Sequence, residues 1–168
     1  MFTEATKADC KKVAKLATKT FVDAFGHLYN EGNRDQHIID KFSPEYFEQS
    51  LDAGDTVLMM HVDGQFIGYA KVGHLSLPVK PPIAKGAQEI YRVYIDKPFQ
   101  GKGFGKALML HILSLPRIST ASMVYLGVWE ENLKAQSLYT QYGFLPVGRY
   151  LYQVGDQFDR EIIMGRKR

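Results

Sequence analysis

Residues 91–106 read Tyr-Arg-Val-Tyr-Ile-Asp-Lys-Pro-Phe-Gln-Gly-Lys-Gly-Phe-Gly-Lys, an apolar strand followed by a turn, a glycine-rich loop and the start of a helix. Gly101, Gly103 and Gly105 can take positive φ and let the backbone approach a ligand closely. The helix predicted for residues 104 or 105 to 115 begins there, so its unpaired N–H groups point outward. Such a helix end binds phosphate, and we therefore expect a phosphate-bearing ligand at this loop.

Two better-known phosphate-binding motifs do not match the residues of this loop. A Walker loop requires Gly at position 100 and Ser or Thr at position 107, where the chain has Gln100 and Ala107. A dinucleotide fingerprint requires Gly at position 106, which is Lys106. Lys102 and Lys106 add positive charge to the loop, although lysines near a loop are more often simply solvated. A glycine-rich turn from strand to helix also occurs as plain architecture.

Length and composition limit the class of protein. With 168 residues and 45% hydrophobic content, the chain suits one globular domain, residues 1–168, with a sizeable core. The tail Arg166, Lys167 and Arg168 supplies the whole net charge of +3, because the other basic and acidic residues balance. No basic face is implied, and we expect no nucleic-acid partner.

Cysteine, histidine and apolar content point to a cytoplasmic protein without a metal. Cys10 is the only cysteine, so no internal disulfide forms. No apolar run reaches the roughly 18 residues of a membrane helix, and residues 1–4 lack the regions of a signal peptide. The five histidines show no paired metal-ligand spacing. They are His27, His37, His61, His74 and His111.

Hydrophobic periodicity and turn residues predict a mixed order of helices and strands. Predicted helices cover residues 6–25, 36–42, 44–53, 104–115 and 133–142. Predicted strands cover residues 2–5, 56–62, 65–74, 87–95, 122–128, 144–152 and 158–164. Residues 26–35 and 77–85 are predicted loops. Asp63-Gly64 is a strong hairpin signal, and Ser43 is a helix cap before Pro44. This order indicates an α+β or mixed three-layer plan.

Two motifs at a fixed separation resemble those of one superfamily. The pattern Gln-x-x-Gly-x-Gly, formed by Gln100, Gly103 and Gly105, is similar to the pyrophosphate loop of the GNAT superfamily of acetyl-CoA-dependent N-acyltransferases. The superfamily's second motif is matched by Asn132, Ala135, Tyr139, Gly143 and Phe144. The match spans residues 87–164.

A closer similarity is to the bacterial PaiA-type branch, whose characterised activity is acetylation of spermidine and spermine. Three segments carry it: Leu-Gly-Val-Trp-Glu-Glu-Asn at residues 126–132, Phe-Gly-His-Leu-Tyr at residues 25–29, and Gly155-Asp156. Each segment alone has a plainer interpretation, such as packing for Trp129. Together they indicate lineage more than substrate.

The resemblance implies a GNAT fold, a central, mostly antiparallel twisted sheet of about seven strands flanked by helices. It implies acetyl-CoA as acyl donor, with its pyrophosphate on the amides of residues 100–105 and its pantetheine arm along residues 93–95. The implied cofactor-binding residues are Val93, Tyr94, Ile95, Gln100, Gly101, Lys102, Gly103, Phe104, Gly105, Lys106 and Asn132, with Lys134 and Tyr142 as weaker candidates. Asn132 is either a helix cap or a cofactor contact, or both.

Two residues are candidates for catalysis. Tyr139 occupies the position from which many superfamily tyrosines protonate the departing thiolate, but its helical spacing also suits a core tyrosine. Glu89 lies where some members carry a catalytic glutamate. It acts as a base, directly or through water, or else is structural or binds a cationic substrate. Arg92 stands an odd number of positions from Glu89, and we expect it on the opposite face.

The predicted function is transfer of the acetyl group to a primary amine, with polyamines as the leading acceptor class. Acidic residues in or near the first loop could attract a polyamine: Asp23, Glu31, Asp35 and Asp40. Three alternatives remain, namely another small amine, a protein N-terminus, and a non-catalytic acyl-CoA-binding module. The resemblance also allows a homodimer, although no sequence feature locates an interface.

Overall fold

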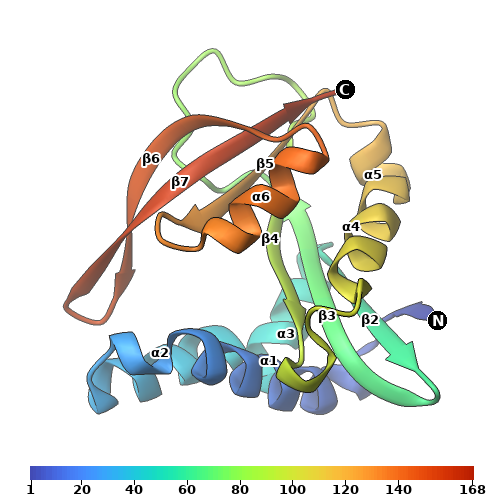
Figure 1. Ribbon diagram of the computed structural model, residues 1–168, viewed down its shortest axis with the longest axis vertical. Coiled ribbons are helices and arrows are strands. Elements are labelled where there is room, and N and C mark those ends of the chain that lie inside the picture. The colour runs from blue at the N-terminus through green and yellow to red at the C-terminus, as the bar shows by residue number, and fades with distance from the viewer.

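The computed structural model describes all 168 residues as a seven-stranded sheet between two groups of helices (Figure 1). The strand order is β1-β2-β3-β4-β5-β7-β6, and only β4 and β5 are parallel neighbours. The strands are β1 (Phe2–Glu4), β2 (Thr56–Val62), β3 (Gln65–His74), β4 (Gln88–Ile95), β5 (Met123–Trp129), β6 (Leu145–Val154) and β7 (Gln157–Lys167). The predicted mixed, mostly antiparallel sheet is confirmed.

Helices cover both faces of this sheet. They are α1 (Cys10–Phe25), α2 (Glu31–Phe42), α3 (Pro44–Asp52), α4 (Phe104–Ser114), α5 (Pro116–Ser119) and α6 (Leu133–Gln141). Single 3-10 turns occupy Lys7–Asp9, Gly26–Leu28 and Lys97–Phe99. Helices α1 to α3 lie against one face, and α4 to α6 lie on the other (Figure 1).

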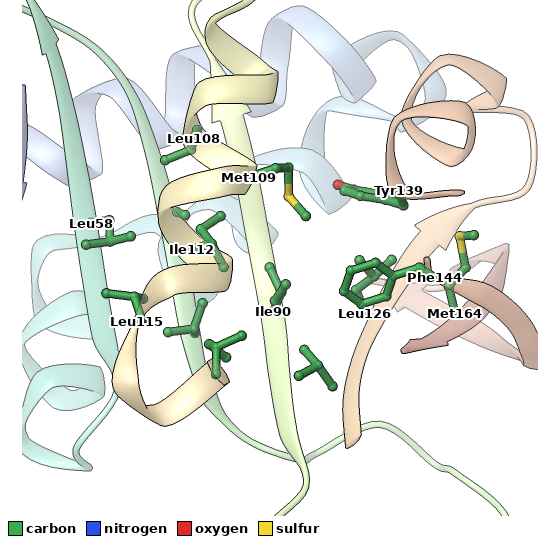
Figure 2. Packing of buried hydrophobic residues seen from close by; sticks show 14 of the residues in the cluster. Leu58, Ile90, Leu108, Met109, Ile112, Leu115, Leu126, Tyr139, Phe144 and Met164 are labelled. Carbon is green, nitrogen blue, oxygen red and sulfur yellow. The ribbon is translucent and has the colours of Figure 1, made fainter. Parts of the chain in front are cut away.

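The core has two main parts, one on each face of the sheet. Leu58 and Ile90 pack with α4 (Figure 2), whereas Val57 and Met59, from alternate positions of β2, pack with α1 and α3. Alternate side chains of a strand point to opposite faces, so a strand covered on both sides must be apolar at nearly every position. This requirement explains the continuous apolar run of β2.

The main error in the predicted helices concerns residues 26–35. We expected a loop there, but α2 begins at Glu31, five residues before the predicted start. The Asn30 side chain accepts a hydrogen bond from the Asn33 N–H at 2.9 Å and so caps the helix. Its first turns carry few apolar residues because they lie largely exposed, which removed the periodic signal. The short α5 was also not predicted.

A bulge in β4 changes which of its side chains share a face. Lys71 of β3 lies opposite Arg92, and Val72 lies opposite Ile90, so Tyr91 is an extra residue. Arg92 therefore shares with Glu89 the face that α1 to α3 cover. The predicted opposite placement of Glu89 and Arg92 was wrong, because the spacing rule assumes an unbroken strand.

The sheet opens between β4 and β5. The two strands pair only over residues 88–90 and 124–126. Beyond that point β4 continues to Ile95 and β5 to Trp129 without pairing to each other. The strands therefore part in the middle of the molecule and leave backbone groups free to bind a ligand.

We expect Ser43→Ala to lower the free energy of unfolding by about 1 kcal/mol. Ser43 precedes α3, and its Oγ accepts a hydrogen bond from the Tyr46 N–H at 3.2 Å. Urea unfolding measures the loss. Ser137→Ala, an exposed position within α6, is the matched control. Equal losses in the two variants would show that the Ser43 cap contributes nothing.

Candidate active site

The opening between β4 and β5 adjoins a cavity of about 820 Å³. Its wall includes residues of β4, β5, α1, α2, α6 and the β6-β7 hairpin, so segments from most of the chain meet here. Aromatic side chains form much of the wall, among them Phe25, Tyr29, Trp129, Tyr150 and Tyr152. Such a wall suits an apolar chain or an organic cation.

The glycine-rich loop has the positive-φ backbone that the sequence predicts. Gly101 and Gly103 have φ of 77° and 86°, and Gly103 is the residue before the first turn of α4. Gly105 lies within the helix and does not take positive φ, so that part of the prediction was wrong. The Gln100 Nε2 donates to the Ile95 carbonyl at 2.9 Å and ties the loop to the end of β4.

Positive charge lies at the beginning of α4. Lys102 and Lys106 are exposed, and neither forms an ion pair. The Tyr142 hydroxyl donates to the Lys106 carbonyl at 3.2 Å and joins the end of α6 to this turn. Lys134, on α6, is also exposed. Unpaired cations beside a helix N-terminus favour an anionic ligand.

The backbone of β4 offers hydrogen bonds to the opening. The Asp96 N–H donates to the Ile67 carbonyl, and the direction of such groups alternates along an antiparallel pair. The groups of Val93 and Ile95 therefore point away from β3 toward the gap. Tyr94 instead bonds within the sheet, and its ring stacks on Tyr69 with centroids 5.7 Å apart.

Tyr139 projects from α6 into the core beside the cavity. Its ring lies 6.2 Å from that of Phe144, and Figure 2 shows its hydroxyl turned away from Phe144 toward the side of α4. Burial raises the pKa of Tyr139 to about 12, and the negative charge of Glu161 adds to the effect. The phenol is therefore neutral and can donate a proton at physiological pH.

Asn132 is a helix cap, which is one of the two roles that the sequence left open. Its Oδ1 accepts from the Ala135 N–H at 3.1 Å and caps α6. The same residue lines the cavity. The cap fixes where α6 begins and so fixes the register of Tyr139 on that helix.

Glu89 lies in the cavity wall, and its carboxylate already accepts three hydrogen bonds. Its Oε2 accepts hydrogen bonds from the Ser76 N–H at 2.7 Å, the Ser76 Oγ at 2.9 Å and the Leu77 N–H at 3.0 Å. Burial raises the pKa of this carboxyl, and the hydrogen bonds from Ser76 and Leu77 oppose the increase. Glu89 therefore anchors the loop between β3 and β4 at the edge of the cavity.

Two further carboxyls in the cavity wall were not predicted from the sequence. Glu161 Oε2 accepts from the Tyr150 hydroxyl at 2.5 Å, and Asp159 accepts from the Tyr29 hydroxyl. Both acids lie on β7 at alternate positions, in register with the buried Ile163. The sequence did carry a signal for them, because two acids at alternate positions before a core residue are expected to share its inward face.

The acidic residues predicted to attract the acceptor lie outside the cavity wall. Asp23 pairs with Lys19 at 3.0 Å, and Glu31 and Asp35 both pair with Arg34. The fourth, at position 40, accepts a hydrogen bond from Gln36. They belong to helical turns at the surface, and the contacts named here are made within their own helices and not to the cavity.

Three cations line the wall, Lys41, Lys71 and Arg92, and the last two are held by neighbouring groups. Lys71 Nζ lies 3.0 Å from the Asp55 carboxylate, so a carboxylate already compensates its charge. The Arg92 guanidinium lies 4.2 Å from the centre of the Phe42 ring and donates to the Lys41 carbonyl at 2.9 Å. It thereby compensates the C-terminal end of α2.

No group of three or more His, Cys, Asp or Glu side chains is arranged to hold a metal ion. None of the helices has both the length and the apolar content needed to cross a membrane.

Residues 15–144 match the model of the acetyltransferase (GNAT) family, and the chain therefore belongs to that family. This membership confirms the predicted class of enzyme, an N-acetyltransferase that uses acetyl-CoA. The loop, the free β4 backbone and the gap beside them fit the donor that the sequence implied.

Relatives and a solved structure agree with this membership. The chain is 28% identical to the N-alpha-acetyltransferase RimI of Mycobacterium tuberculosis, over 89% of this chain and 82% of that protein. It is 29% identical to the spermine/spermidine N(1)-acetyltransferase of Bacillus subtilis, over 51% of this chain and 56% of that protein. The PaiA N-acetyltransferase of Thermoplasma acidophilum, solved in complex with coenzyme A, superposes with a TM-score of 0.75 at 19% identity, covering 100% of this chain and 98% of that one. The PaiA-type branch expected from the sequence is therefore among its structural neighbours.

Proposed function

We propose that the chain transfers the acetyl group of acetyl-CoA directly to a primary amine of a small molecule, with a polyamine such as spermidine or spermine as the acceptor. One observation carries the proposal. The gap between β4 and β5 joins the backbone groups of Val93 and the N–H of Ile95 to a cavity walled by aromatic rings and carboxyls that include those of Glu89, Asp159 and Glu161. Such a wall attracts a flexible organic cation.

The donor occupies the side of the gap next to the glycine loop. Its pyrophosphate binds the amides of residues 100–105, assisted by Lys102 and Lys106, and its pantetheine arm pairs with the β4 backbone. This arrangement directs the thioester toward the point where β4 and β5 part. The Val93 N–H is the nearest candidate for stabilising the oxyanion that forms on the acetyl carbonyl.

The transfer needs one proton acceptor and one proton donor. A primary amine of pKa about 10 is only about 0.1% neutral at pH 7, so a base must remove a proton before attack. The neutral amine then forms a C–N bond with the acetyl carbon and the C–S bond breaks. Tyr139 protonates the departing thiolate, and the nitrogen releases its second proton to regenerate the phenol or to solvent.

The carboxyls and aromatic rings of the wall support this acceptor class, and so does the Bacillus subtilis relative, whose name states a polyamine substrate. The RimI relative keeps a protein N-terminus as the competing acceptor. Thiol release from acetyl-CoA, measured across spermidine, spermine, monoamines, amino acids and short peptides, separates the two. We expect the highest kcat/KM with polyamines. Turnover confined to peptides would overturn the acceptor class. No thiol release with any of these amines, with acetyl-CoA binding retained, would indicate a different acceptor or a non-catalytic binding module.

We expect Gly103→Ala to raise the KM for acetyl-CoA about tenfold with little change in kcat. Gly103 has a φ of 86°, where a Cβ costs roughly 1–2 kcal/mol, so the loop would relax and lose its ligand geometry. The matched control is Gly32→Ala, since Gly32 lies in α2 away from the loop and does not take positive φ. An unchanged KM in Gly103→Ala would remove the loop from the donor site.

A further inference from the structure

We infer that Glu161, held by Tyr150, takes the proton from the acceptor amine, and that Glu89 serves chiefly to anchor the loop that borders the site. The inference rests on the proposed acetyl transfer and identifies its base. It is drawn from the place where β7 positions a carboxylate, whereas the resemblance of the sequence favoured Glu89 on β4.

The absence of a side chain at Gly127 lets Glu161 reach the reaction point. A methyl group built on Gly127 would lie 2.6 Å from both Glu161 Oε2 and Tyr150 Oη, so these atoms lie directly over the β5 backbone. Gly127 follows Leu126, the last residue of β5 paired to β4. The Glu161 carboxylate therefore crosses from β7 over β5 to the place where β4 and β5 part.

Glu89 borders the same place from the other strand, but its hydrogen-bond capacity is largely used. Three donors of Ser76 and Leu77 converge on one oxygen, Oε2. Burial raises the pKa of Glu89, whereas these hydrogen bonds and the Lys71 charge oppose the increase. By contrast, Glu161 accepts one hydrogen bond, from Tyr150, and pairs with no cation.

The groups around Glu161 make its carboxylate a stronger base than an ordinary one. The titratable groups that interact with it are Tyr150 and Tyr152 on β6, Asp159 on β7, Glu89 on β4, Tyr139 on α6, and Tyr29 just before α2. Burial raises the pKa of Glu161, the charges of Asp159 and Glu89 raise it further, and the Tyr150 hydrogen bond lowers it. A carboxylate with a raised pKa is a better base for an ammonium group.

The proton count balances without another reactant. The ammonium group passes one proton to the Glu161 carboxylate, which becomes the carboxylic acid, and the amine is left neutral. After attack on the thioester, Tyr139 protonates the departing thiolate, and the second proton of the nitrogen returns to the Tyr139 phenolate to regenerate the phenol. Glu161 then returns its proton to solvent, and the net products are the acetamide, free CoA thiol and one proton.

The test compares Glu161→Gln, Glu89→Gln and a control, Glu45→Gln, which changes an exposed residue in the first turn of α3. Thiol release with spermidine is followed from about pH 6 to about pH 10. We expect Glu161→Gln to lower kcat by about 10²-fold or more at pH 7, with a small change in KM. The loss should shrink as pH approaches about 10, where the amine loses its proton unaided.

Two further variants cover the case in which Glu161→Gln does not fold. Gly127→Ala pushes the carboxylate away while keeping its charge, and should lower kcat in the same pH-dependent way. Tyr150→Phe removes a hydrogen bond that lowers the pKa of Glu161, so the acidic limb of kcat/KM should move to higher pH.

The outcomes distinguish failure of this assignment of the base from failure of the proposed acetyl transfer. A wild-type protein that acetylates no amine removes the proposed function itself. If wild type is active but Glu161→Gln keeps kcat within twofold, or loses activity without recovery at high pH, the assignment of the base is overturned. A loss confined to Glu89→Gln, with the same recovery at high pH, would assign the base to Glu89.

Discussion

Tyr139→Phe is expected to lower kcat by about 10²-fold or more, with the affinity for CoA nearly unchanged. The substitution removes one hydroxyl and keeps the ring that packs against Phe144. Because burial holds the pKa of Tyr139 at about 12, the phenol stays protonated throughout the assay range and can serve as a proton donor. Steady-state kinetics gives kcat, and calorimetry with CoA gives the affinity.

The control for this prediction is Tyr125→Phe. Tyr125 is buried against Ile163 on the opposite face of the sheet and does not line the cavity. We expect its kcat to equal that of wild type. If Tyr139→Phe also retained full kcat, the proton of the leaving thiolate would have to come from solvent, and Tyr139 would be a core tyrosine only.

Phe144→Ala is expected to lower the free energy of unfolding by about 3–5 kcal/mol, the largest effect on stability that we predict. Phe144 is fully buried where the chain leaves α6 and enters β6, and it packs with Tyr139, Leu126 and Met164 (Figure 2). Truncation leaves a cavity that joins two strands and a helix. Urea unfolding monitored by circular dichroism measures the loss.

Phe158→Ala is the matched control, because Phe158 is 56% exposed on β7. It should cost well under half as much. Similar losses in the two variants would mean that the interface between α6 and the sheet contributes little to stability. In that case the position of Tyr139 would depend on its own helix and not on packing.

Much of the fold could be predicted from the sequence because local signals agreed with the final structure. Asp63-Gly64 takes the positive φ of a hairpin turn, and the strands on either side have the predicted limits. Ser43 and Asn132 cap the helices that were expected to follow them. Gly143, expected just past the end of α6, has a φ of 81°. These features depend on residues a few positions apart.

The parts that escaped prediction depend on contacts distant in sequence. The bulge at Tyr91 exists only in the pairing of β3 with β4, and no local pattern within β4 marks it. Glu161 reaches the cavity only because β7 lies next to β5 and Gly127 leaves room above that strand. The acidic residues on α1 and α2 were predicted to attract the acceptor, but they lie outside the cavity wall. Charge alone does not reveal which face of a helix points toward the cavity.

A crystal structure of the protein with CoA and spermidine would test the proposed donor and acceptor sites most directly. We expect the pyrophosphate of CoA on residues 100–105 and its thiol beside Tyr139, at the point where β4 and β5 part. We expect the polyamine in the aromatic cavity, with one amine at Glu161. CoA bound away from the glycine loop, or a polyamine bound only outside this cavity, would contradict the proposed sites.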